Sequence, residues 1–408
     1  MIKTLKTFRY IIIFSIIYYC FSAWQIVGMN FFSSSAVPYY NQLLKSFLTG
    51  RLDIIPANAS DLSFYQNRWY LYWGPSPVLL IGMFKMLTIE SDRLYTLIIG
   101  IFNIIVFCYL LEEINKYFKL KLTNFSKYSL VIFFGLLTPN YYLSLSGRIW
   151  HTNQIVSIFY LLAGLLLLFM YLNKKRVIYF IAAVILFNLA WLARMTLAGY
   201  MIIIIYLLLI IKLTAYKRLF VIFMTITLLT VVLFFIYNFA RFNNIFEFGL
   251  TYQISYPSLL YVQQNNILLS PQYILRNFYF HFVRLISIDW TYPFISIDLG
   301  GNSIFIIYPF TILLSFNLKN IFNQIKVNAL ILIIAAVSLA QIIILLFYYN
   351  TGYAQFGSRY YLDVFPLLLI LLATVINKIN RNFIISVIIL GVTINYFGAI
   401  RFYQLLSF

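Results

Sequence analysis

Residues 174–218 read KKRVIYFIAAVILFNLAWLARMTLAGYMIIIIYLLLIIKLTAYKR, and this stretch decides the class of fold. Its apolar part, 177–211, is too long for a single membrane-spanning helix, which takes about 20 residues. Basic residues flank it on both sides, and such flanks stay on the cytoplasmic side of a membrane. The stretch is therefore predicted to form two short helices that turn near Ala193–Met195, so that the chain crosses the membrane and returns.

The composition as a whole also indicates a membrane protein. Of the 408 residues, 63% are apolar and only 10% are charged, whereas about a quarter of the residues of a soluble domain carry a charge. This excludes a soluble globular enzyme, and it excludes nucleic acid as the reason for the net charge of +19. The two cysteines, Cys20 and Cys108, lie in apolar stretches and form no disulfide or metal-binding pattern.

Eleven stretches are predicted to be transmembrane helices. They are the two halves of 177–211 and the segments 10–29, 94–111, 128–145, 149–172, 219–237, 303–318, 329–348, 360–376 and 383–400. A further apolar stretch, Pro75–Ile89, is too short to cross and carries Pro75 and Pro77 at its start, so a re-entrant or interfacial segment is predicted there. The predicted fold class is an all-α polytopic membrane protein, with one membrane domain over residues 1–408.

The distribution of charge orients this topology. Seventeen of the 29 lysines and arginines fall in loops on one side, and thirteen of those seventeen are lysines. The positive-inside rule makes that side cytoplasmic, so the N terminus is expected inside and the C terminus outside. The outer side holds ten arginines, eight acidic residues and both histidines. Because the guanidinium fork suits phosphate and carboxylate, this set indicates an anionic ligand such as a lipid phosphate.

Two outer segments, 30–93 and 238–302, are far longer than ordinary connections and rich in aromatic residues, so ordered functional loops are predicted. In the first segment, Pro38–Thr49 has the spacing of an amphipathic helix lying on the membrane surface. Its apolar side is expected to consist of Tyr39, Leu43, Phe47 and Leu48.

The first outer segment also carries candidate functional residues. Arg68, Trp69 and Tyr70 fit a platform for a sugar or a lipid headgroup, and they fit an interfacial aromatic belt about equally well. Asp53 and Asp61 favour the platform, because a belt requires no carboxylates. Either aspartate is a candidate catalytic base.

Further candidates lie at predicted helix mouths. Arg148, Trp150 and His151 stand where a long helix begins, and His151 is a candidate general base or phosphate donor. Polar groups at the end of a span are also tolerated without any function. Arg194, at the outer turn, fits either contact with lipid phosphate or a place in a central cavity.

Two charged pairs complete the candidates. Arg241 and Glu247 leave a helix end together and form either a structural ion pair or part of a substrate site. Arg359 and Asp363 are spaced to share one face of an α-helix, with Tyr360 beside them. This second pair is predicted to be either structural or an anion-binding site.

Several of these motifs follow one another in a recognisable order. They are the loop helix within 39–52, Asn67-Arg68-Trp69-Tyr70 with Pro75-x-Pro77, Trp150-His151, Asn238-x-x-Arg241-Phe242 with Glu247-Phe248-Gly249, and Gly357-x-Arg359-Tyr360. This order resembles the GT-C superfamily of membrane glycosyltransferases, particularly the branch of protein mannosyltransferases and aminoarabinose transferases. Each motif is short, and together they span most of the chain.

The resemblance implies an outward-facing enzyme of a bacterial inner membrane. It would transfer a sugar from a polyprenyl-phosphate carrier in the membrane to an acceptor, without a nucleotide. It implies no certain cofactor beyond an optional divalent metal. In that superfamily an acidic residue after the first helix serves as base or metal ligand. The matching stretch here, Ser33–Pro38, has none, so Asp53 or Asp61 would have to replace it.

Two alternatives stay open at this point. A lipid-linked-saccharide polymerase or transporter would also present outward arginines, but a transporter should carry polar residues through the middle of the bilayer. A non-catalytic relative that binds a lipid-linked sugar is favoured by the missing acid.

Overall fold

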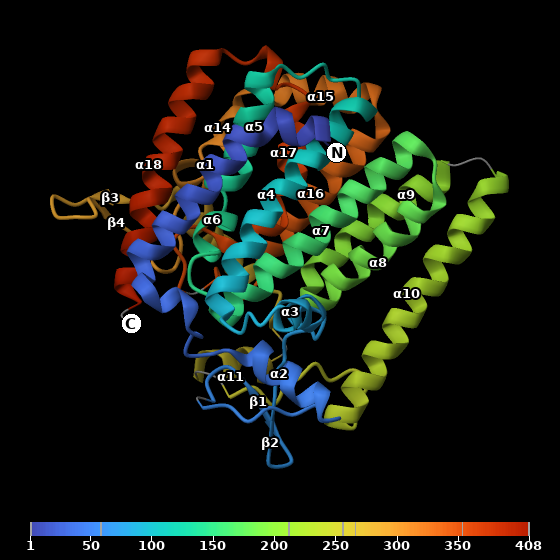
Figure 1. The fold of residues 1–408 in the computed structure, drawn as a ribbon, viewed down its shortest axis with the longest axis vertical. Helices are drawn as coiled ribbons and strands as arrows, with labels where there is room; N and C mark the ends of the chain where they lie inside the picture. Colours follow the sequence, from blue (N-terminus) through green and yellow to red (C-terminus); the bar gives the residue numbers. More distant parts are fainter. Residues whose placement is uncertain are drawn as a thin grey trace.

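The structure, a computed structural model, describes residues 2–57, 59–210, 213–254, 257–265, 267–352 and 354–406. The chain forms a bundle of helices with two small hairpins (Figure 1). The α-helices are α1 (Ile2–Val27), α2 (Tyr39–Leu48), α3 (Pro77–Met86), α4 (Asp92–Tyr117), α5 (Asn124–Leu136), α6 (Pro139–Leu143), α7 (Ile149–Lys174), α8 (Val177–Ala193), α9 (Met201–Ile210), α10 (Leu213–Phe242), α11 (Pro257–Gln264), α12 (Ile274–Phe278), α13 (Ile304–Ile307), α14 (Phe310–Phe316), α15 (Leu318–Val327), α16 (Ala329–Phe347), α17 (Phe365–Ala373) and α18 (Arg381–Leu405). The shorter 3-10 or π turns are η1 (Gly28–Phe32), η2 (Met195–Tyr200), η3 (Pro271–Tyr273), η4 (Tyr279–Val283), η5 (Arg359–Asp363) and η6 (Ile376–Lys378), and the strands are β1 (Ser63–Tyr65), β2 (Arg68–Tyr70), β3 (Ser287–Ile288) and β4 (Ile295–Ser296).

Within the described residues, six helices are long and apolar enough to cross a membrane, so the chain is an integral membrane protein. They are Thr4–Phe32, Asp92–Tyr117, Ile149–Lys174, Tyr216–Phe242, Ala329–Phe347 and Arg381–Leu405. The predicted pair within 177–211 is present as two shorter apolar helices that turn at Arg194, Val177–Ala193 and Met195–Ile210. The predicted total of eleven crossings is not confirmed.

Prolines explain why three of the predicted spans are shorter than expected. The stretch 128–145 is divided before Pro139, 303–318 is divided at Pro309, and 360–376 begins as a 3-10 turn before Pro366. Proline has no backbone N–H to donate and its ring clashes with the preceding turn, so a helix ends or restarts there. Apolar periodicity alone does not reveal these breaks.

The two ends of the bundle differ. At one end, called the basic end, the lysine-rich connections meet: Ser126 Oγ donates to Asn377 Oδ1 at 2.8 Å, and Asn173 Nδ2 donates to Glu113 Oε2 at 2.8 Å. At the other end, called the loop end, α2, β1, β2 and α11 gather beyond the helices (Figure 1). The first long segment and α11 of the second therefore lie opposite the short basic connections, while the β3–β4 hairpin projects from the side of the bundle (Figure 1).

The short apolar segment before α4 forms α3, a helix of 10 residues that packs against α2 and α7. Ser76 Oγ donates to the Leu189 carbonyl at 2.7 Å and fixes the start of this helix against α8. Gly74 passes so close to α8 that a Cβ there would lie 1.4 Å from the Leu192 oxygen. A helix of this length is too short to span a bilayer.

The loop helix α2 falls within its predicted range. It buries Tyr39, Tyr40, Leu43 and Leu44, while Leu48 is 69% exposed. The residues predicted for the apolar side are thus divided: Tyr39 and Leu43 pack inside the protein, whereas Leu48 stays exposed. The buried face is rotated toward Tyr40 and Leu44, because these side chains pack toward α3 and the bundle.

The bundle interior contains a small polar network as well as apolar side chains. Asn103 Nδ2 donates to Asn140 Oδ1 at 2.9 Å, and Asn140 Nδ2 donates to the Tyr19 hydroxyl at 2.9 Å. All three residues are fully buried. Buried polar groups are tolerated when they bind each other, so this network fixes the register of α1, α4 and α6.

Candidate functional site

Asp61 lies at the centre of the best candidate site, at the loop end of the bundle. Trp150 Nε1, from the first turn of α7, donates to Asp61 Oδ2 at 2.9 Å. Gln253 Nε2, from the second long segment, donates to Asp61 Oδ1 at 3.1 Å. Asp61 has a φ of 58°, a left-handed conformation that aspartate tolerates better than most residues. The carboxylate is thus held by two neutral donors, and each oxygen keeps a lone pair for a further proton or ligand.

Two tyrosines, Tyr72 and Tyr349, lie near this carboxylate, and two more lie beside them. Asp61 is within electrostatic range of Tyr72 and Tyr349, and Tyr72 is within the same range of Tyr348 and Tyr360. The rings of Tyr348 and Tyr360 have centroids 5.9 Å apart. Burial raises the pKa of Tyr349 to about 12 and raises the pKa of Tyr72 well above its usual value. These hydroxyls therefore stay protonated near neutral pH and act as neutral hydrogen-bond donors.

Arg194 sits beside this tyrosine group and is neutralised. Its Nε and NH2 both donate to Asp363 Oδ2, at 3.1 and 2.8 Å, and Thr196 Oγ1 donates to the same oxygen at 2.6 Å. The Arg194 guanidinium also lies 5.4 Å from the ring centroid of Tyr360. The turn between α8 and η2 is in this way tied to η5, and a central position for Arg194 agrees better with the structure than contact with lipid phosphate does.

The predicted pair between Arg359 and Asp363 is wrong. The pair assumed an α-helix, but residues 359–363 form the 3-10 turn η5, with about three residues per turn. Residues four apart in a 3-10 turn point in different directions, so Asp363 turns to Arg194 instead.

Because Asp363 pairs with Arg194, Arg359 is left without an acidic partner at this site. Among the described residues no carboxylate lies within ion-pair distance of its guanidinium, and its Nε is buried without a hydrogen bond. The guanidinium lies 5.2 Å from the Tyr360 ring centroid and within electrostatic range of Tyr348 and His151. A partly buried arginine with no counter-ion, among neutral tyrosines, suits an anionic ligand.

Other residues singled out in the first loop lie elsewhere. Asp53 pairs with Arg51 at 2.5 Å, and this guanidinium holds the pKa of the Asp53 carboxyl below its usual range. Arg68 is exposed in β2, whereas Trp69 stacks on Phe64 with centroids 4.6 Å apart. Tyr70, the last residue of β2, is 5% exposed and packs on Phe242. The contacts of Arg68, Trp69 and Tyr70 belong to the β1–β2 hairpin and those of Asp53 to Arg51, and none of them is a hydrogen bond to Asp61 among the described residues.

Arg241 and Glu247 do not bind each other. Arg241 is 3% exposed, donates to the Leu71 carbonyl at 2.7 Å and to Asn238 Oδ1 at 2.8 Å, and lies 3.9 Å from the Tyr237 ring centroid. Glu247 Oε1 instead accepts from the backbone N–H of Gly249 at 2.6 Å. Arg241 fastens the first long segment to α10, which leaves little of its guanidinium for a ligand.

His151 is close to Arg359 but is enclosed. It is 2% exposed, its Nδ1 shares a hydrogen bond of 2.9 Å with Ser146 Oγ, and the rings of Phe402 and Tyr403 lie against it. Arg148 is half-buried at the N-cap of α7 and within electrostatic range of Tyr403. The structure therefore places these two residues behind the site rather than in contact with Asp61.

The loop that lacks the expected acid receives one from another element. Asp92, at the start of α4, accepts from the backbone N–H of Ser35 at 2.7 Å and from Ser35 Oγ at 2.5 Å. Asp92 is 1% exposed. Its carboxylate is therefore used to anchor the loop to α4.

Sequence reasoning missed Gln253, Tyr348 and Tyr349. Gln253 stands in an irregular segment with no pattern around it, and the backbone pairing of residues 252–254 with residues 62–64 brings it to Asp61. The two tyrosines follow the apolar helix α16, where they are indistinguishable from an aromatic belt. Their nearness in the sequence to the two tyrosines at 360–361 is the one feature that could have indicated a site there.

Comparisons with known proteins give one structural similarity. No protein-family model matches the chain, and no curated protein matches it. The chain is similar to the crystal structure of ArnT from Cupriavidus metallidurans bound to undecaprenyl phosphate, with a TM-score of 0.49 and 13% sequence identity. The similarity covers 90% of this chain and 60% of that chain. The overlap is loose, and the chemistry of the site rests on the residues described above.

Proposed function

We propose that this protein is a glycosyltransferase that uses a polyprenyl-phosphate-linked sugar on the outer face of the membrane, to modify a glycan or lipid of the cell envelope. One observation carries the proposal: a held carboxylate, Asp61, and an arginine without a counter-ion, Arg359, border the same group of neutral tyrosines. Transfer of a sugar from a lipid phosphate requires two groups at the membrane surface. One is a base that accepts the proton of the acceptor, and the other is a cation that binds the phosphate.

The proposed step uses these groups as follows. An acceptor hydroxyl attacks the anomeric carbon of the sugar, and the bond between that carbon and the phosphate oxygen breaks. The hydroxyl proton passes to Asp61, and the bonding electrons leave with the polyprenyl phosphate. Arg359 stabilises the charge that develops on the leaving phosphate, and the hydroxyls of Tyr72 and Tyr349 donate hydrogen bonds to sugar or phosphate oxygens.

A divalent metal is the optional cofactor of this proposal, and the donor set does not fit one. No group of three or more metal-ligating side chains occurs in the described parts of the chain. Divalent cations of this kind take several oxygen ligands, and the neighbours that contact the Asp61 carboxylate, Trp150 and Gln253, do so through N–H donors. No step is therefore assigned to a metal, and we expect EDTA to leave sugar transfer unchanged.

Binding and transfer test different halves of the proposal. We expect Arg359→Gln to weaken the binding of undecaprenyl phosphate to the purified protein by about tenfold or more, as expected for loss of a charge-assisted contact. The exposed Arg284→Gln serves as the matched control and should bind normally. Equal binding by both variants would contradict the anion-site assignment.

Transfer is tested in membranes supplied with a panel of polyprenyl-phosphate sugars. Asp61→Asn should lose transfer by about a hundredfold or more while still binding the lipid phosphate, because only the base is removed. Asp53→Asn, also an aspartate of the first loop, should keep transfer. Binding of undecaprenyl phosphate without transfer from any donor by the unaltered protein would indicate the non-catalytic relative instead.

A further inference from the structure

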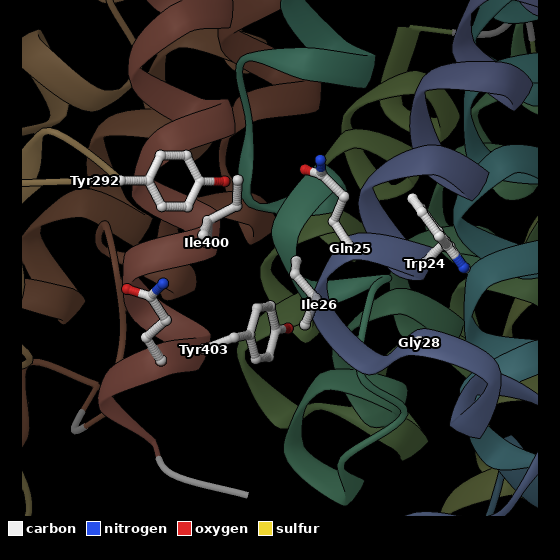
Figure 2. A pocket seen from close by; sticks show the side chains of 8 residues that line it. Trp24, Gln25, Ile26, Gly28, Tyr292, Ile400 and Tyr403 are labelled. Carbon is white, nitrogen blue, oxygen red and sulfur yellow. The ribbon is translucent and has the colours of Figure 1, made fainter.

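A cavity lies between α1 and α18, outside the group around Asp61. It has a volume of about 560 Å³ and is bounded by the end of α1, the end of α18 and the β3–β4 hairpin. Figure 2 shows Gln25 and Ile26 extending from α1, with Ile400 and Tyr403 on the facing wall. The volume is within the range of small-molecule sites, about 300–1,000 Å³.

The lining of this cavity is aromatic and polar but uncharged. Trp24, Tyr292 and Tyr403 supply three aromatic rings, and Gln25 and Gln404 supply two primary amides. Trp24 is 55% exposed and Tyr292 is 53% exposed, so these two rings are open to an approaching ligand, whereas Tyr403 is buried in the wall. A carboxamide offers both a donor and an acceptor, which matches two neighbouring hydroxyl groups.

The charges near the cavity are already paired. Arg401, between two residues of the α18 wall, lies 3.6 Å from Asp289 of the hairpin. No lysine, arginine or acidic residue lines the cavity within the described part of the chain. A phosphate group bound in this cavity would have no unpaired cation beside it, whereas a phosphate bound next to Arg359 would.

The amides are placed to bind a ligand. Tyr396 donates its hydroxyl proton to Gln25 Oε1, which orients this side chain and leaves its NH₂ as a donor. The Gln404 side chain makes no hydrogen bond to any other described residue. Tyr403 is fixed from behind, because its hydroxyl donates to the Tyr142 carbonyl at 2.6 Å. One wall of the cavity is therefore rigid, and one edge has free polar atoms.

We propose that this cavity binds the uncharged sugar headgroup of a membrane glycolipid. Aromatic rings pack against the C–H face of a pyranose while amides bind its hydroxyls, and the position at the ends of α1 and α18 places the headgroup at the membrane boundary. The proposal is independent of the transfer chemistry, because it concerns binding at residues that do not touch Asp61 or Arg359.

The test uses three probes with the purified protein in an amphipol: dodecyl maltoside, dodecyl phosphocholine and maltose. Saturation-transfer NMR on the sugar ring protons measures contact with the aromatic wall. We expect saturable binding of dodecyl maltoside, and we expect Trp24→Ala combined with Gln404→Ala to weaken it about tenfold. The matched controls, Trp290→Ala and Gln272→Ala, alter exposed residues outside the cavity and should bind normally.

Other outcomes overturn the proposal. Equal binding by the double variant and the controls places the probe elsewhere. Competition by dodecyl phosphocholine at the same concentration indicates a groove for acyl chains, and equal binding of maltose alone overturns the assignment to a lipid-linked sugar. The Asp61→Asn variant should bind dodecyl maltoside normally, so a failure of the transferase proposal is distinguishable from a failure of this one.

Discussion

At the scale of single residues, the buried ion pair between Arg194 and Asp363 makes the sharpest prediction. Their side chains are 13% and 4% exposed, and removing one partner of such a pair leaves an uncompensated charge that costs about 3–5 kcal/mol. We expect Asp363→Asn to lower the thermal unfolding temperature of the detergent-solubilised protein strongly. The double variant Arg194→Met with Asp363→Leu should recover part of this loss, and additive losses would contradict the pairing.

The same scale shows what the sequence could predict about the site and what it could not. Trp150 and Arg359 were singled out from their types and their places near helix mouths, and Asp61 was singled out as a carboxylate of the first long segment. Their connection was not predictable, because Gln253 and Tyr349 reach Asp61 only through the folding of irregular segments. Tertiary contacts of this kind leave no periodic trace in the sequence.

At the scale of elements, close helix packing gives a second prediction. In α18, a Cβ on Gly398 would lie 2.0 Å from Cζ of the fully buried Phe356. We expect Gly398→Ala to destabilise the protein by about 1–3 kcal/mol, the usual cost of overpacking. Gly82→Ala in α3 is the matched control, since its nearest neighbour would be an ordinary 3.8 Å away and alanine favours a helix. The measurement is the thermal unfolding temperature of both variants, which should fall for Gly398→Ala and not for Gly82→Ala.

A third prediction concerns Arg241, which holds the first long segment against α10. Its bond to the Leu71 carbonyl joins that segment to α10, and its bond to Asn238, within α10, orients the guanidinium. Removing both loosens this attachment. We expect Arg241→Ala to speed tryptic cleavage at the exposed Arg51 and Arg68 by about tenfold, since hydrogen bonds to a charged group contribute about 1.5–3 kcal/mol. Arg284→Ala, which removes an exposed pair with Asp298, should leave the cleavage rate unchanged.

Helix positions were largely predictable, and helix interruptions were not. Each of the eleven apolar stretches corresponds to a helix or a divided helix. Burial in lipid or in the core requires apolar side chains, and this requirement holds whether or not the helix is interrupted. The divisions at Pro139, Pro309 and Pro366 depend on local backbone geometry, and the 3-10 turn before Pro366 redirected Asp363 from Arg359 to Arg194.

At the scale of the whole molecule, the separation between the basic end and the loop end yields the last prediction, which concerns orientation. The positive-inside rule places the basic end in the cytoplasm, so the loop end, with Asp61 and Arg359, should face outward. We expect Gln66→Cys, exposed at the β1–β2 turn, to react with a membrane-impermeant maleimide in intact cells, after Cys20 and Cys108 are replaced by alanine. Lys175→Cys, exposed at the basic end between α7 and α8, should react only after the cells are opened. The opposite pattern would place the site in the cytoplasm, and it would remove the reason for expecting an outward-facing transferase while leaving the contacts within the site unchanged.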